Sequence, residues 1–216
     1  MTQAPDPGRG ARVIASYDAI AEEYAKQYFD ELDGKPWDRA WLDRFAATVA
    51  GQGRVCDLGC GPGQIARYLA GRGVDAFGID GSAAMVAIAR GLNPTLRFEH
   101  ADFFGLPLPD GALAGVAAFY SLIHCAREDL GRAVRELARV LAPDGRLLMA
   151  VHEGAGEVGR DEAFGKRVAL VATLFSEAEV RAAVTGAGLT IDELAVRPPY
   201  DFEYQSRRIY VRATRP

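Results

Sequence analysis

Residues 55–63, VCDLGCGPG, place three glycines on alternate positions directly after an apolar run that ends in a carboxylate. Glycine adopts positive φ at low cost and lets a ligand approach the main chain, so the glycines predict a tight turn between a strand and a helix. We expect the helix over residues 64–70, where its free N–H groups would point at whatever lies over the turn. The stretch therefore predicts a site for a small molecule.

The second expected strand, residues 74–79, is followed by Asp80, about 20 residues after the first glycine, where ribose-binding βαβ units place an acidic residue. Gln64 occupies the position where a dinucleotide-binding turn has its third glycine, which argues against NAD. Asp57 puts a negative charge beside the turn, which suits an ammonium group and suits a pyrophosphate badly. We therefore expect a nucleoside that carries an amine.

These residues resemble the class I S-adenosylmethionine-dependent methyltransferases of small-molecule type, whose main signatures are a DxGxGxG turn and an acidic residue at the end of the second strand. The resemblance implies that Asp57 lies near the methionine amine, that the turn contacts the cofactor and that Asp80 binds its ribose. It also implies that Asp102, after an expected strand at 96–100, accepts a hydrogen bond from the adenine amino group. S-adenosyl-L-methionine is then the cofactor and S-adenosyl-L-homocysteine the product.

Each of these features taken alone has an ordinary explanation, since glycine turns occur in many α/β proteins and a single acid can be a helix cap. Three acidic positions after three expected strands are harder to obtain by chance. The full set of expected cofactor-binding residues is Tyr17, Tyr24, Asp57, Gly59, Cys60, Gly61, Gly63, Asp80, Gly81, Met85, Ala101, Asp102, Phe103 and Phe119.

The remaining pattern predicts an α/β fold with a seven-stranded, mostly parallel sheet and helices on both faces. Residues 176–179 carry a capping-box signature for a late helix, and the last two strands, joined without a helix, predict an antiparallel last strand. The resemblance implies a Rossmann-like arrangement. We expect one domain, 1–216, with an N-terminal helical lid (1–50), a cofactor-binding core (51–151), and a substrate cap with C-terminal strands (152–216).

The chain has 216 residues, of which 49% are hydrophobic and 25% charged, and a formal net charge of −4. This composition suits one globular domain, and the charge gives no general attraction to nucleic acid. No leader pattern or membrane-spanning run is present in the sequence, so we expect a cytoplasmic protein. The three cysteines lack paired spacing, so we expect reduced thiols. No acidic ligand pair follows the fourth expected strand, so we expect no metal. Monomer and homodimer both stay open.

The first ten residues predict a mobile tail, and a helix follows in which tyrosines recur at helical spacing. Residues 17–24, YDAIAEEY, resemble the N-terminal segment that folds over the cofactor as a lid in many small-molecule methyltransferases. On this basis Tyr17 and Tyr24 are expected to reach the methionine end. The alternative is ordinary core packing, which is the usual role of such a stripe.

Ligands of open parallel sheets bind beyond the carboxyl ends of the strands, which places the acceptor near His124 and His152. Either imidazole is a candidate proton acceptor, and the alternative is that both only shape the pocket. Residues 154–175 predict an irregular substrate cap with wall residues Phe164, Leu170, Leu174 and Phe175, and residues 200–204 predict an edge hairpin or an aromatic rim. The expected substrate residues are Tyr28, Tyr120, His124, His152, Glu153, Tyr200 and Tyr204.

The sequence thus predicts methyl transfer to nitrogen, oxygen or carbon of a small metabolite. A second hypothesis keeps the cofactor but gives it non-methyl chemistry, because one cradle can serve different reactions. A third hypothesis is an interaction protein that binds the cofactor, or NAD, without turnover.

Overall fold

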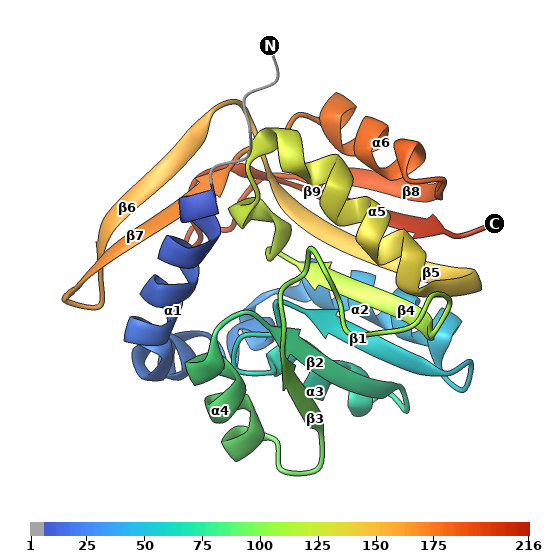
Figure 1. Ribbon diagram of the computed structural model, residues 1–216, viewed down its shortest axis with the longest axis horizontal. Coiled ribbons are helices and arrows are strands. Elements are labelled where there is room, and N and C mark those ends of the chain that lie inside the picture. The colour runs from blue at the N-terminus through green and yellow to red at the C-terminus, as the bar shows by residue number, and fades with distance from the viewer. Residues whose placement is uncertain (1–6) are drawn as a thin grey trace.

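The computed structural model describes residues 7–216, in which a seven-stranded sheet and a two-stranded hairpin are combined with flanking helices (Figure 1). In chain order the elements are α1 (Pro7–Tyr28), η1 (Glu31–Gly34), α2 (Pro36–Val49), β1 (Arg54–Leu58), α3 (Gln64–Ala70), β2 (Asp75–Asp80), α4 (Ala83–Leu92), β3 (Arg97–His100), β4 (Leu113–Phe119), η2 (Leu122–His124), η3 (Arg127–Asp129), α5 (Leu130–Val140), β5 (Leu141–Glu153), β6 (Glu157–Ala163), β7 (Lys166–Thr173), α6 (Glu177–Gly186), β8 (Thr190–Arg197) and β9 (Arg207–Thr214).

The large sheet has the strand order β3-β2-β1-β4-β5-β9-β8. Strands β1 to β5 pair in parallel, whereas β9 lies antiparallel between β5 and β8. The chain order reverses between β1 and β4, and ligands of open α/β sheets bind at such a switch point. The predicted fold class, with its antiparallel last strand, is confirmed.

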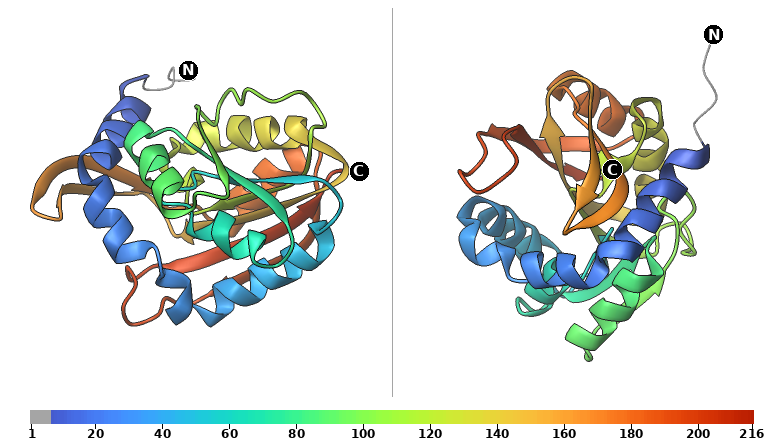
Figure 2. Two further views of the ribbon diagram at one scale, coloured as in Figure 1. Left: turned by 90° about the horizontal axis from the view of Figure 1, so that it is seen from below. Right: turned by 90° about the vertical axis from the view of Figure 1, so that its left-hand side faces the viewer.

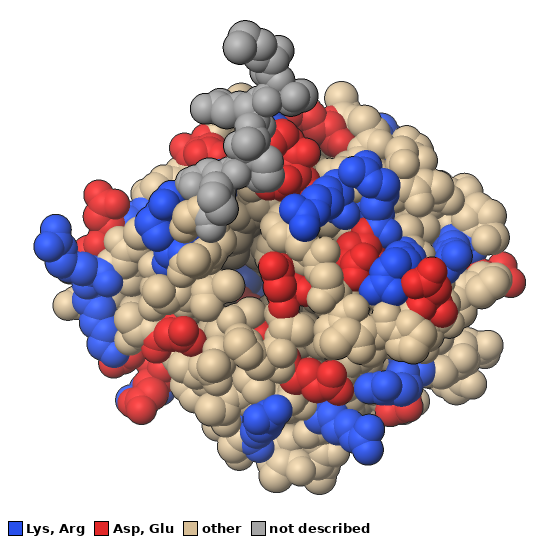
Figure 3. All heavy atoms as spheres, viewed as in Figure 1, with Lys and Arg blue, Asp and Glu red and all other residues tan. Residues whose placement is uncertain are grey.

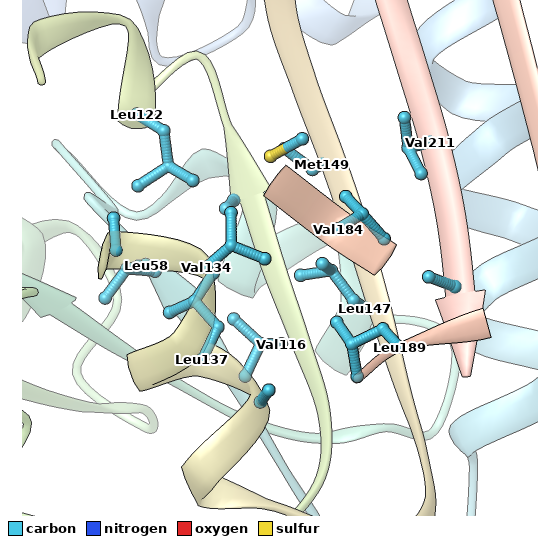
Figure 4. Close-up of a cluster of buried hydrophobic side chains, with 14 of the residues drawn as sticks. Leu58, Val116, Leu122, Val134, Leu137, Leu147, Met149, Val184, Leu189 and Val211 are labelled. Atoms are coloured by element: carbon cyan, nitrogen blue, oxygen red, sulfur yellow. The ribbon is translucent and has the colours of Figure 1, made fainter. Parts of the chain in front are cut away.

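Each central strand is buried on both faces, so neighbouring residues pack into different cores. In β1, Val55 packs with Trp41 and Phe45 of α2, while Cys56 packs with the cluster that α5 and α6 cover. Figure 2 shows helices on either side of the sheet, and Figure 4 shows Val134 and Leu137 of α5 over the strands. Continuous apolar strands are expected when helices cover both faces of a parallel sheet.

The helix ends follow local sequence signals. Ser176 caps α6 through the backbone N–H of Glu179, whose side chain accepts in return from the Ser176 N–H, so the predicted capping box is confirmed. The predicted tail over residues 1–10 is wrong for residues 7–10, where α1 already begins with Pro7, a residue favoured in the first turn. Its first six residues lie outside the part that the structure describes.

The segment 154–175 was predicted to be irregular and is instead the antiparallel hairpin β6–β7, which is set apart from the large sheet. Phe164 and Gly165 form its two-residue turn, with φ of 53° and 71°, as the twist of a tight hairpin requires. β6 is almost wholly exposed and polar, so it lacks the apolar alternation that marks a strand. Phe175 was predicted to line the pocket, but it is fully buried in the main core.

Candidate functional site

A cavity of about 590 Å³ lies at the carboxyl ends of the strands, a size typical of small-molecule sites. The glycine turn after β1 and the ends of β2, β4 and β5 form its floor. Residues of α1, the β6–β7 hairpin and the β8–β9 loop form its other walls. Three segments far apart in the sequence therefore enclose one space above the switch point.

Two backbone hydrogen bonds fix the turn after β1 to the neighbouring strand. The Ile79 carbonyl accepts from Gly59 N (2.7 Å) and Cys60 N (3.1 Å), which joins the turn to β2. Gly59 has a φ of 67°, and a Cβ there would stand 2.3 Å from that of Ser121, so no side chain fits. Gly61 also lines the cavity, but a Cβ there would have 3.8 Å to its nearest neighbour. The turn thus presents bare backbone to the cavity.

Asp80 ends β2 and lines the cavity, as predicted. Its two oxygens accept from Gly61 N and from Ser82 N, each at 2.8 Å, and burial raises the pKa of its carboxyl. Each carboxylate oxygen can accept more than one hydrogen bond, so both can still receive a donor from a ligand. Asp80 is therefore placed to accept from vicinal hydroxyls.

Asp57 lies behind the turn and does not line the cavity. It is 1% exposed, and Oδ2 accepts from Ala66 N at 2.9 Å, which satisfies one of the free N–H groups at the start of α3. Burial raises the pKa of this carboxyl to about 7. Asp57 thus anchors the helix behind the glycines, and the structure does not bring it into the cavity.

Beyond Asp80, the predicted residues Gly81, Met85 and Phe103 line the cavity together with Phe104. Ala101 and Asp102 do not line it. Asp102 is exposed and its Oδ1 accepts from Phe104 N at 3.0 Å, which makes a local turn. Gly63 is also outside the cavity wall. A Cβ there would stand 2.7 Å from Phe98, so this glycine is required for packing.

The helix α1 covers one side of the cavity and places Tyr17, Tyr24 and Tyr28 in its wall, beside the hairpin (Figure 1). Hydrogen bonds from the middle of α1 join it to two different elements. Ser16 Oγ accepts from Ala169 N of β7 at 2.8 Å, and Asp18 Oδ1 accepts from Ser82 Oγ at 2.6 Å, at the start of α4.

His124 lines the cavity and both of its ring nitrogens are engaged. Nδ1 lies 2.8 Å from the Val171 carbonyl, which can only accept, so Nδ1 carries the proton. Nε2 therefore accepts from the Tyr17 hydroxyl, also at 2.8 Å. Burial lowers the pKa of His124 to about 4, so the imidazole is neutral near pH 7. His124 links α1 to β7.

The opposite end of the cavity is lined by Tyr120, His152 and Tyr204. Tyr120 has a φ of 55°, which is strained for a residue with a side chain, and its hydroxyl reaches Tyr210 (2.6 Å) and Asp38 (3.2 Å). His152 Nδ1 lies 2.7 Å from Ser206 Oγ, and burial lowers its pKa to about 3.

Two expected substrate residues lie outside this wall. Glu153 pairs with Arg207 on the strand β9, and the Tyr200 hydroxyl accepts from Trp37 N at 3.0 Å. Tyr200 stacks on Phe202, which does line the cavity and is 67% exposed. Both the predicted hairpin and the predicted aromatic rim are therefore present. The β8–β9 loop connects two antiparallel strands, and it places aromatic rings at the cavity.

An ion-pair network supports the floor at this end. Arg197 is 4% exposed and donates to Asp38 Oδ2 (3.0 Å) and to both oxygens of Glu203. Lys35 lies 3.4 Å from Glu203, and its cation faces the Tyr120 ring at 5.7 Å. The cavity wall is therefore polar below and mostly apolar at the hairpin, where Val158, Leu170 and Leu174 line it together with Arg160.

The comparisons with known proteins agree with this geometry. A family model described as a methyltransferase domain matches residues 55–145. Trans-aconitate 2-methyltransferase of Methylobacterium nodulans is 33% identical over 191 residues, which cover 80% of this chain and 71% of that protein. The chain belongs to the class I S-adenosylmethionine-dependent methyltransferases.

One further sequence relative and one solved structure are similar to this methyltransferase. Demethylmenaquinone methyltransferase of Thermus thermophilus is 40% identical over 121 residues, 52% of each chain. This chain spans about half the length of the first curated relatives that it matches. Magnesium protoporphyrin IX methyltransferase of Synechocystis PCC 6803, solved with bound S-adenosylmethionine, covers 100% of both chains with a TM-score of 0.72 at 20% identity, and it shows the shared fold.

S-adenosylmethionine is the cofactor of this family, and the cavity suits it. Asp80 offers acceptors for ribose hydroxyls and Gly61 leaves room for close approach. Within residues 7–216, Gln64 Oε1 and Ser121 Oγ are buried without a hydrogen-bond partner, and both residues line the cavity beside the turn. Such atoms are costly unless a ligand meets them. Neither residue was in the predicted set, because nothing in the sequence distinguishes an unpaired amide or hydroxyl.

Two observations bear on other partners. In the described part of the chain, no helix is both long and apolar enough to cross a membrane, and no group of three potential ligands is arranged to hold a metal ion. On the face seen in Figure 3, basic and acidic side chains are interspersed.

Proposed function

We propose that this methyltransferase moves the methyl group of S-adenosylmethionine to a nitrogen, oxygen or carbon atom of a small molecule. The observation that carries the proposal is the single cavity that joins the glycine turn and Asp80 to the compartment around Tyr120 and His152. A shared cavity allows the methyl donor and the acceptor to lie in contact, which an in-line displacement requires.

When bound, the cofactor supplies a methyl group on a positively charged sulfur. Asp80 accepts from its ribose hydroxyls, and the bare backbone at Gly61 allows it to lie close to the turn. Tyr17 and Tyr24 cover it from α1 and exclude water, which strengthens the polar interactions beneath them. The protein's main contribution is alignment, because the donor is already activated.

Acceptors that must lose a proton need a base, and the two histidines differ in this respect. His124 has both nitrogens engaged, so we assign it a positioning role that fixes Tyr17. His152 is the remaining candidate proton acceptor. Its pKa of about 3 makes it a weak base, which favours acceptors that are already ionised or that ionise readily.

The enclosed cavity favours a small acceptor. The hairpin wall is mostly apolar, with Arg160 as its charged residue, and the floor carries Lys35, Glu203 and Arg208, so the acceptor is expected to have an apolar part and a polar part. The relatives named above act, by their names, on trans-aconitate and demethylmenaquinone, which are small molecules. With a formal net charge of −4, we expect no nucleic acid substrate.

Calorimetric titration with S-adenosylmethionine, S-adenosylhomocysteine and NAD tests the cofactor. We expect both adenosyl sulfur ligands to bind and NAD not to bind. Asp80→Ala should weaken binding by about 1.5–3 kcal/mol, the value of charged hydrogen bonds. Asp75→Ala is the matched control and should change nothing, because Asp75 is exposed at the first position of β2 and lies outside the cavity wall. Binding of NAD alone would contradict the proposal.

Turnover is tested separately by incubating the protein with S-adenosylmethionine and a mixture of metabolites. Formation of S-adenosylhomocysteine with a methylated product supports methyl transfer. Binding without any consumption of the cofactor would favour the interaction protein, and consumption without methylation would favour non-methyl chemistry.

A further inference from the structure

Gln64 presents a buried acceptor to the cavity. The residue is 8% exposed, and its Oε1 lies 3.9 Å from the point where a Cβ on Gly61 would stand. This oxygen has no partner among the described residues. A carbonyl oxygen can only accept, so the group that it awaits is a donor.

The orientation of the Gln64 amide is fixed by its neighbours. Its Nε2 donates to Glu31 Oε1 at 3.1 Å, and the other oxygen of Glu31 accepts from Lys35 Nζ at 2.6 Å. A carboxylate accepts only, so the amide must turn its NH2 group to Glu31 and its oxygen away from it. The contacts from Lys35 to Glu31 and from Glu31 to Gln64 therefore hold an acceptor beside the turn. Glu31 itself lies in the cavity wall.

Ser121 provides the second unpaired atom, beside Gly59 of the same turn. It is 9% exposed, and its Oγ would stand 3.2 Å from a Cβ on Gly59. It precedes η2 without capping it through its side chain. A hydroxyl can donate, so Ser121 suits an acceptor on the ligand.

An acceptor beside Gly61 and a donor beside Gly59 of one turn match an α-amino acid, which carries an ammonium group and a carboxylate. Asp57 was the residue expected to bind the ammonium group. Its carboxylate instead accepts a hydrogen bond at the start of α3, and it lies outside the cavity wall.

On the basis of the proposed function, we propose that Gln64 and Ser121 hold the amino-acid end of S-adenosylmethionine. Gln64 Oε1 accepts from its ammonium group and the Ser121 hydroxyl donates to its carboxylate. Glu31 acts as a positioning residue that sets the Gln64 amide and adds a negative charge near the ammonium group.

The test is calorimetric binding of three ligands: S-adenosylmethionine, its decarboxylated form, which keeps an amine, and 5′-methylthioadenosine, which has neither group. Gln64→Met should weaken the first two by about ten- to a hundredfold and leave methylthioadenosine unchanged, because hydrogen bonds to charged groups have that strength. Ser121→Ala should weaken S-adenosylmethionine alone, by about tenfold.

Equal weakening of all three ligands by either variant would show a structural role and overturn the proposal, as would no weakening. If a variant fails to fold, the wild-type protein still decides, because methylthioadenosine must bind at least tenfold more weakly than S-adenosylmethionine. Failure of the proposed function is distinct, since then no adenosyl sulfur ligand binds the wild-type protein.

Discussion

Replacing Asp38 by alanine should be among the most destabilising single changes in this chain. Asp38 is 1% exposed and accepts from Arg197 Nη2 (3.0 Å) and from the hydroxyls of Tyr210 (3.1 Å) and Tyr120 (3.2 Å). Its removal takes one carboxylate partner from the buried Arg197 cation. It also leaves one buried hydroxyl proton without an acceptor, because the Tyr120 and Tyr210 hydroxyls can still bond each other. Removing one partner of a buried pair costs about 3–5 kcal/mol, because the other charge is left uncompensated.

The structure places the expected loss at the lower end of that range, about 3 kcal/mol, because Arg197 keeps both contacts to Glu203. Burial raises the pKa of Asp38 despite the nearby cations, which also argues against a larger value. The matched control is Asp30→Ala, which removes an exposed pair with Arg67 and should cost about 0–1 kcal/mol.

Urea unfolding followed by circular dichroism measures both variants at pH 7. A loss in the Asp38 variant within 1 kcal/mol of the Asp30 control would refute the reasoning, since burial would then make no difference to the two pairs.

Three further predictions concern stability. Ser176→Ala removes the α6 cap and should lower the free energy of unfolding by about 1 kcal/mol in urea, and an unchanged value would contradict the capping role. Gly59→Ala forces a Cβ to 2.3 Å from that of Ser121 and should lower the melting temperature far more than Gly73→Ala, where φ is 77° but the space is open; equal shifts would contradict the steric argument. The two cavity histidines have pKa values lowered to about 4 and about 3, so between about pH 6.5 and 4 the unfolded chain binds more protons and stability falls as the pH falls, by about 1.4 kcal/mol per pH unit for each. Asparagine at either position should make that slope shallower in urea titrations.

Features that depend on a few contiguous residues could be predicted from the sequence. The glycine turn and the α6 capping box depend on neighbours within a few positions, so each could be recognised in the sequence. The strand β6 could not be predicted, because its exposed polar residues carry no periodicity and its pairing depends on β7.

Within the site, the sequence predicted a set of acidic residues but not which of them faces the cavity. Asp57 lies within β1, Asp80 ends β2 and Asp102 follows β3, and only Asp80 lines the cavity. The difference lies in which amide each carboxylate meets, Ala66 N for Asp57 and Phe104 N for Asp102, and that depends on the path of the chain after each strand. Gln64 and Ser121 are 57 positions apart, so no local pattern could relate them.

The hydrogen bonds between α1 and the hairpin couple the cofactor and acceptor regions of the cavity. Arg9 of α1 donates to Thr173 of β7 at 2.7 Å, and Ser16 accepts from Ala169, so α1 and the hairpin are expected to shift together. Any motion that admits the cofactor then also uncovers the acceptor. Each ligand that holds this cover shut should tighten binding of the other, and by reciprocity the two enhancements are the same factor. Cooperativity between donor and acceptor is thus expected from the way one cover serves both.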